Sequence, residues 1–146
     1  VMSAKIFQTL RNDHDKQRTL LDLVSKTKGD SNGRRELFDR LKNELANHAK
    51  AEEQSLYAAM MSKDNAVTKA RHSVAEHKEI DDLVETLEDM DFSSPHWLPT
   101  FGKLHERVLH HLEEEEHEVF QVAGRVLTDQ TKNSLNADFE EAHPKM

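Results

Sequence analysis

The chain of 146 residues contains no cysteine, which excludes disulfide bonds and thiolate metal sites and leaves His, Asp and Glu as metal ligands. It has only four glycines, three prolines and 5% aromatic residues, a composition that favours long helices with short connections over a sheet. Its start, VMSAKIFQTLRNDHDK, has no apolar signal-peptide core, and no run of about eighteen apolar residues follows. We therefore expect a soluble, cytoplasmic protein.

Charged residues make up 33% of the chain, and the formal net charge is -8. This excess of acidic groups argues against nucleic acid and membrane surfaces as partners, because both are themselves negatively charged. The length is that of one ordinary domain, so residues 1–146 are expected to form a single domain. Ten histidines are the feature of the composition that requires an explanation.

Apolar residues recur at helical spacing in four long segments, and polar or turn-forming residues separate these segments. A shorter fifth segment follows them. Four amphipathic helices with brief links predict an all-α fold, an up-down-up-down four-helix bundle with a short additional C-terminal helix. The expected helices run from 3 to about 27, about 34 to 62, about 65 to 90, about 95 to 126, and about 129 to 142.

Several residues at the expected boundaries have the chemistry of helix N-caps. Ser31 or Asn32 is expected to cap the second helix, and Asp64 the third. Ser94 is expected to cap the fourth, with Pro95 in the first helical position, where its missing N–H costs nothing.

Polar residues interrupt the apolar stripe of every long helix. At about 100° per residue, His111 and Glu115 fall in the same sector as the apolar residues of the fourth helix, and His48 and Glu52 do so in the second. Two helices therefore present His-x-x-x-Glu to the interior.

The first and third helices each contribute one inward histidine, His14 and His77. Counting residues from each histidine to the nearest turn and back, at about 1.5 Å per residue, places all four inward histidines at one level near the middle of the bundle. Buried carboxylates without a partner cost several kcal/mol, so two of them beside four imidazoles indicate a bound cation cluster.

The remaining histidines and glutamates are interpreted as surface residues. His110 and Glu114 also form His-x-x-x-Glu, but they are rotated away from the centre of the apolar stripe. Residues expected to point outward, or to be solvated without a matched partner, are Glu113, Glu116, His117, His72, His96, His105 and His143, the last of which lies outside the residues that the structure describes.

Six nitrogen and oxygen donors, two of them carboxylates able to bridge, fit two first-row metal ions better than one zinc ion. Ferritin-like di-iron proteins instead use pairs of Glu-x-x-His. Here only Glu114/His117 and Glu140/His143 have that spacing; the first pair is expected to face outward and the second lies in the tail. The ferritin-like class is therefore disfavoured.

Four stretches together resemble the hemerythrin-like (HHE cation-binding) domains: DHDKQRTLL around His14, HAKAEEQSLY from His48, EHKEIDDL around His77 and HLEEEEHEVF from His111. The resemblance implies a four-helix bundle that holds an oxo- or hydroxo-bridged pair of non-heme iron ions. Its implied ligands are His14, His48, Glu52, His77, His111 and Glu115.

One position departs from the oxygen-carrying members of that family. They have a second histidine four residues before the ligand of the third helix, and this chain has Ser73 there. Serine is a poor iron ligand, so about two positions of an octahedral pair would stay open to water, O2, peroxide or NO. A more open site favours exchange and redox turnover over protected oxygen carriage.

The leading functional interpretation is a di-iron protein that binds, senses or handles O2 or a related small oxidant. The alternatives are an enzyme that decomposes peroxide or NO, for which Tyr57 is the nearest acid or base, an iron buffer or store, and a bundle that binds metal adventitiously. Storage is disfavoured because the sequence has no sign of a cage-forming assembly.

Overall fold

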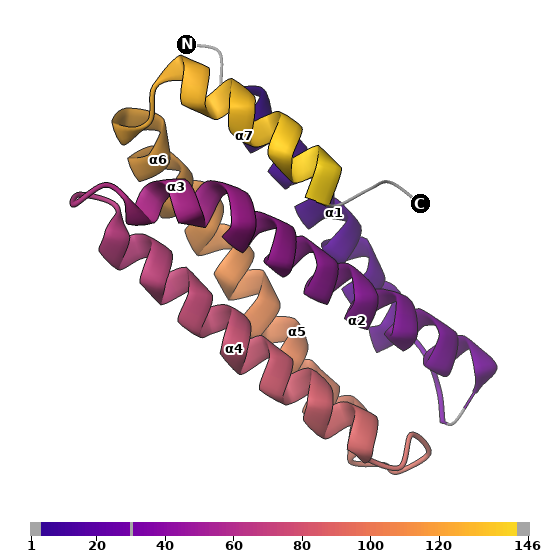
Figure 1. The fold of residues 1–146 in the computed structure, drawn as a ribbon. Helices are drawn as coiled ribbons and strands as arrows, with labels where there is room; N and C mark the ends of the chain where they lie inside the picture. The colour runs from indigo at the N-terminus through magenta and orange to yellow at the C-terminus, as the bar shows by residue number, and fades with distance from the viewer. Residues whose placement is uncertain (1–3, 30, 143–146) are drawn as a thin grey trace.

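The computed structural model describes residues 4–29 and 31–142, and every regular element in this part of the chain is a helix (Figure 1). Two of the four long segments of the bundle are single α-helices. They are the first and the third, α1 (Lys5–Ser25) and α4 (Val67–Asp89).

The second and fourth long segments each contain one π-helical turn at an equivalent place. The second consists of α2 (Asn32–Glu52), the π-helical turn η1 (Glu53–Tyr57) and α3 (Ala58–Met61). The fourth consists of α5 (Trp97–Glu114), the π-helical turn η2 (Glu115–Val119) and α6 (Phe120–Val126). The expected up-down-up-down bundle is confirmed, and the two π-helical turns are features that the periodicity did not predict. Such turns occur frequently at functional sites.

The helix boundaries agree with the sequence at one cap and differ at two. Ser31 caps α2, since its hydroxyl oxygen accepts a hydrogen bond from the Arg34 N–H at 3.1 Å. Asp64 does not cap α4, because two further residues pass through a turn before that helix begins at Val67. The fourth helix was expected from about residue 95 and begins at Trp97, so Ser94 lies in the turn before it, where its hydroxyl accepts a hydrogen bond from the His96 N–H at 3.1 Å.

The apolar core consists of two clusters, one toward each end of the bundle. The cluster near the loop between α4 and α5 is built around aromatic rings, with Trp97 and Phe101 stacked at 5.5 Å between centroids. The opposite cluster contains Leu10, Leu56 and Phe120. Burying these side chains stabilises the bundle by about 1.5 to 3 kcal/mol each. The inward polar residues lie between the two clusters.

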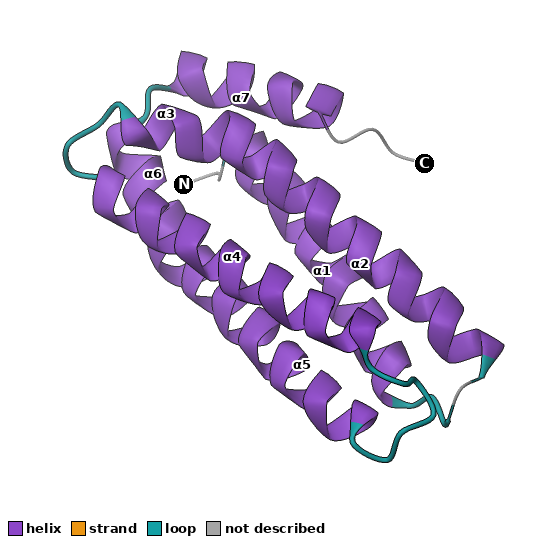
Figure 2. Ribbon diagram, turned by 60° about the horizontal axis from the view of Figure 1, so that its bottom comes forward, coloured by secondary structure: helices purple, strands orange, loops and turns teal. Residues whose placement is uncertain are grey.

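The C-terminal helix α7 (Asp129–Ala142) packs outside the bundle, against α1, α2 and η1 (Figure 2). Asn136 on its inner face accepts a hydrogen bond from the Thr9 hydroxyl at 2.7 Å. Phe139 lies edge-on to the His48 ring, 5.5 Å between centroids. The fifth helix is thus confirmed at its expected place, and it covers one of the inward histidines. None of the described helices combines the length and apolar character needed to cross a membrane.

Candidate metal centre

All six inward residues predicted from the sequence meet in one buried layer. The side chains of Glu52 and Glu115 are fully buried at its centre. The four imidazoles surround them, one from each long segment of the bundle, so the agreement in height that the residue count predicted is confirmed. The buried ring pairs are His14 with His48 and His77 with His111, at 5.2 and 4.8 Å between centroids.

Each glutamate extends one oxygen toward each pair of histidines. Glu115 Oε1 lies 3.2 Å from His14 Nε2, and its Oε2 lies 3.2 Å from His111 Nε2. Glu52 Oε2 lies 3.4 Å from His48 Nε2, and its Oε1 lies 3.3 Å from His77 Nε2. The layer therefore divides into two halves that share both carboxylates. Each half offers two imidazole nitrogens and two carboxylate oxygens close enough together to hold a metal ion.

The polar atoms at the centre of the layer fit metal ions better than they fit one another. Among the described side chains, His14 Nε2, both oxygens of Glu52 and Glu115 Oε1 are buried without a hydrogen-bond partner. Leaving such groups unpaired costs about 1 to 3 kcal/mol each. Metal bonds of about 2.1 Å separate neighbouring ligand atoms by about 3.0 Å at octahedral angles and about 3.4 Å at tetrahedral angles. The distances between the nitrogen and oxygen atoms of the layer agree with this range.

A ring of four outer carboxylates contacts the Nδ1 atoms of the same histidines. Each carboxylate comes from the segment next to the one that carries its histidine. The Nδ1···O pairs are His14 with Glu116 at 2.7 Å, His48 with Asp13 at 2.9 Å, His77 with Glu53 at 2.9 Å, and His111 with Glu76 at 2.8 Å. A carboxylate on Nδ1 orients the ring, keeps the proton on that nitrogen and makes Nε2 a better metal ligand.

The outer carboxylates are functional candidates that the sequence reasoning missed, although a signal was present. Every one of them is the immediate neighbour in sequence of an inward residue, so the helix turns it by about 100° toward the next segment. The expectation that Glu116 is an ordinary surface residue is wrong. Its side chain is only 15% exposed and also accepts a hydrogen bond from Arg18 at 3.0 Å.

Electrostatic coupling in the layer is strong. Burial lowers the pKa of each histidine, but the carboxylates outweigh it: Glu52 and Asp13 raise the pKa of His48 to about 10, and Glu115 and Glu76 do the same for His111. Burial opposes ionisation of Glu115, yet contacts with Glu52 and the histidines hold its pKa well below the usual range. Without metal the layer thus holds protons as its cations, and a metal ion would have to displace them.

Tyr57 lies on the side of the layer where Ser73 stands. Its buried hydroxyl donates a hydrogen bond to Glu115 Oε2, and its ring stacks on His77 at 5.5 Å between centroids. Burial, together with the charges of Glu115 and Glu52, raises the pKa of Tyr57 well above its ordinary value. The phenol therefore stays protonated and acts as a donor beside the layer.

A cavity of about 20 Å³ adjoins the layer on the side of the aromatic cluster. His48, His77 and His111 line it, together with Gln17 from α1. Gln17 is buried, and its amide nitrogen has no hydrogen-bond partner among the described residues. A space of this size holds about one water-sized molecule. Gln17 therefore offers a free donor next to three of the inward histidines.

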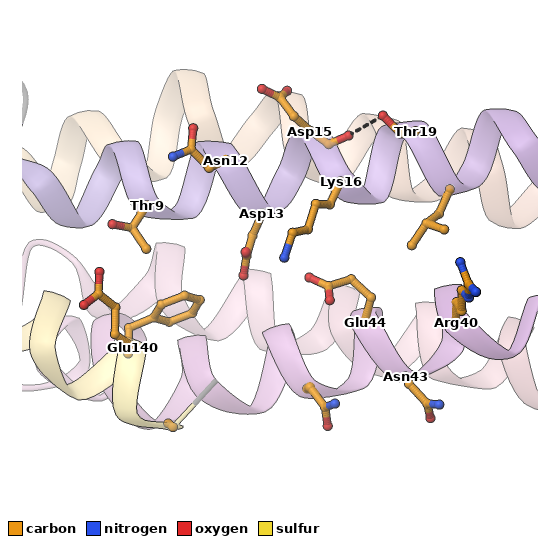
Figure 3. A pocket seen from close by; sticks show the side chains of 14 residues that line it. Thr9, Asn12, Asp13, Asp15, Lys16, Thr19, Arg40, Asn43, Glu44 and Glu140 are labelled. Atoms are coloured by element: carbon orange, nitrogen blue, oxygen red, sulfur yellow. Dashed lines mark hydrogen bonds between the residues drawn. The ribbon is translucent and has the colours of Figure 1, made fainter. Parts of the chain in front are cut away.

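A much larger groove, of about 1220 Å³, runs along the outside of the bundle between α1, α2 and α7. Figure 3 shows Asp13 projecting from α1 into the space between the helices, with Lys16 and Glu44 beside it. Since Asp13 contacts His48 Nδ1, the groove is separated from the buried layer by one side-chain contact. No inward histidine or glutamate lines the groove itself.

The remaining surface predictions can be compared with the structure. His110 is 68% exposed while His111 is buried, so the register chosen for the fourth helix is confirmed. Glu113 and His117 are exposed, as expected. The expectation that His72 has no matched partner is wrong, because its Nε2 lies 2.9 Å from Glu114 Oε1 on the neighbouring helix.

Comparison with known proteins agrees with this geometry. The family model described as the hemerythrin HHE cation-binding domain matches residues 5–123. Among solved structures, a hemerythrin HHE cation-binding domain-containing protein from Mycobacterium kansasii superposes with a TM-score of 0.79 at 22% sequence identity. The alignment covers 98% of this chain and 88% of that one, and at this identity it establishes the fold alone. None of the curated proteins matches the chain.

Proposed function

The chain belongs to the hemerythrin HHE cation-binding domain family, and from this membership and the geometry of the layer we propose that it holds two iron ions. His14 and His48 would hold one ion and His77 and His111 the other, and both ions would share Glu52 and Glu115. The centre binds, senses or handles O2 or a related small oxidant.

The observation that carries the proposal is the position of the two central glutamates. Each places its two oxygens against two different histidine pairs, and three of these four oxygens have no hydrogen-bond partner among the described residues. Carboxylates that span two ligand sets of nitrogen and oxygen atoms, with no sulfur, are typical of two first-row metal ions.

A bound iron pair would supply the redox chemistry, and the side chains of this chain would control access to it. The outer carboxylates keep each imidazole in the tautomer that presents Nε2 to the centre. The cavity beside the layer admits a small molecule, and the Gln17 amide can donate a hydrogen bond to it. The surrounding apolar clusters exclude bulk water, which strengthens electrostatic contacts within the site.

A second candidate function is turnover of peroxide or NO. The buried phenol of Tyr57 favours it, because a neutral donor next to Glu115 can hold or deliver a proton at the site. This candidate and the leading one share the same centre and differ in whether a small ligand is bound or consumed.

The test is to add O2 to the reduced, iron-loaded protein and follow the optical spectrum. We expect a transient spectrum followed by that of the oxidised protein, because serine in place of a histidine leaves the centre accessible to water and protons. A stable, reversible oxygenated spectrum that persisted for hours would instead indicate a carrier. Sustained O2 release on repeated addition of peroxide would favour the enzyme.

A further inference from the structure

A second group of metal-ligating side chains lies on the outer surface, between α4 and α5. It is formed by two His-x-x-x-Glu pairs on facing helices, His72 with Glu76 and His110 with Glu114. This is the spacing that also occurs in the buried layer, where a histidine and a glutamate one turn apart point in the same direction. We name these four residues the outer cluster. None of them is among the six proposed ligands of the buried centre.

The donor atoms of the outer cluster converge. His72 Nε2 lies 2.9 Å from Glu114 Oε1 and 3.5 Å from Glu76 Oε2. The other oxygen of Glu114 lies 3.2 Å from His110 Nε2. Ligands of one metal ion with bonds of about 2.1 Å lie about 3.0 to 3.4 Å apart. His72, Glu76 and Glu114 thus form a group that could hold a cation, with His110 reaching it through the far oxygen of Glu114.

Burial and hydrogen bonding hold the carboxylates in place and leave the imidazoles open to solvent. The side chains of Glu76 and Glu114 are 9% and 16% exposed, whereas those of His72 and His110 are 53% and 68% exposed. Glu76 is further fixed from behind, because its Oε1 is bonded to the buried His111 Nδ1 at 2.8 Å. Its Oε2 is therefore turned outward, toward His72.

We propose that the outer cluster is a separate binding site for a divalent first-row transition metal ion. The imidazole of His72 with the carboxylates of Glu76 and Glu114, and the second imidazole of His110 beside them, suit Zn²⁺ or Co²⁺ better than Ca²⁺ or Mg²⁺, which prefer oxygen ligands alone. The site does not depend on the identity of the metal in the buried centre. It is joined to that centre by Glu76, which contacts the outer cluster through one oxygen and His111 through the other.

An exposed ion pair between protonated His72 and Glu114 would explain one of these contacts, but such a pair contributes only about 0 to 1 kcal/mol. It would not explain why Glu76, which is already bonded to His111 through one oxygen, turns its other oxygen toward the same imidazole. A metal ion held by His72, Glu76 and Glu114 accounts for the convergence of these three side chains. It also places two partly buried carboxylates next to a cation, where their charges are compensated.

Equilibrium dialysis at micromolar Zn²⁺ measures how much Zn²⁺ the purified wild type and its variants bind. The metal content of the buried layer is measured before and after dialysis. The test variants are His72→Ala/His110→Ala and Glu114→Gln. The matched control is His96→Ala/His105→Ala, which removes two histidines from the surface outside both sites. Crystals soaked in Zn²⁺ locate the ion by its anomalous scattering.

We expect the wild type and the control to bind one more Zn²⁺ per chain than the double variant of the outer cluster, with the anomalous peak between His72 and Glu114. The affinity of the Glu114→Gln variant should fall by roughly 10- to 100-fold, at least the cost of losing a supporting carboxylate. Equal Zn²⁺ binding by the wild type and the double variant would overturn the proposal. So would an anomalous peak confined to the buried layer. If Zn²⁺ only replaces the metal of the buried layer, the measured loss of that original metal reveals the exchange.

Discussion

Substitution of Glu116 tests the role of the outer carboxylates, because this residue contacts a proposed ligand without belonging to the proposed ligand set. Its carboxylate accepts from His14 Nδ1, and a charge-assisted hydrogen bond of this kind contributes about 1.5 to 3 kcal/mol, against about 0.5 to 1.5 kcal/mol for a neutral one. Glu116→Gln keeps an acceptor and removes the charge, so it should weaken metal binding by about 1 kcal/mol, roughly fivefold. Glu116→Ala removes both the acceptor and the charge, and we expect it to weaken metal binding by about 2 kcal/mol, which lies within the usual 10- to 100-fold loss of affinity.

Two control variants isolate this effect. Glu113→Ala removes an exposed glutamate from the same helix and should change metal affinity by no more than about twofold. Arg18→Ala removes the second partner of Glu116 but leaves His14 its carboxylate. Because this ion pair is partly exposed, its loss should lower the metal-binding free energy by about 1 kcal/mol or less.

The assay is competition with a chromophoric chelator at fixed pH, with thermal unfolding to verify that each variant is folded. The expected order of loss is Glu116→Ala, then Glu116→Gln, then Glu113→Ala. If Glu116→Ala bound metal as tightly as Glu113→Ala, the outer carboxylates would have no part in preparing the histidines, and the reasoning about their tautomers would be refuted.

Two further predictions concern the buried centre. His111→Ala should lose metal while His110→Ala keeps it, because only His111 points inward. Metal analysis of both purified variants checks this, and the reverse result would place the fourth helix one residue out of register. Gln17→Leu should fold and bind metal like the wild type but bind azide, a small anionic probe, roughly 5- to 30-fold more weakly in an optical titration, since it loses a hydrogen bond of about 1 to 2 kcal/mol. Equal azide affinities would exclude Gln17 as a donor to the bound ligand.

Helical periodicity was sufficient to predict the bundle and the buried layer. His14, His48 and His111 occupy positions in apolar stripes, and a fixed rotation per residue decides which way such residues point. The same arithmetic also chose His111 over its neighbour correctly. The layer was predictable because regular helices convert sequence spacing directly into direction and height.

The other features of the site depend on contacts between helices. The periodicity of a single helix carries no information about such contacts. Glu116 was assigned to the surface because it points away from the bundle axis, yet that direction leads to α1 and His14. His72 was assigned to the solvent for the same reason, although Glu114 lies beside it on the next helix. The two π-helical turns were missed because the periodicity was read with the constant rotation of an α-helix, which makes no allowance for an added residue.

Metal analysis of aerobically purified protein, combined with its optical spectrum, tests the central claim most directly. The account predicts close to two iron ions per chain and the near-ultraviolet charge-transfer bands of a bridged ferric pair, because two donor sets share Glu52 and Glu115. Glu115→Ala, which removes one proposed bridge, should lose both the iron and the bands. A colourless, well-folded protein that contained a single zinc ion would contradict the account.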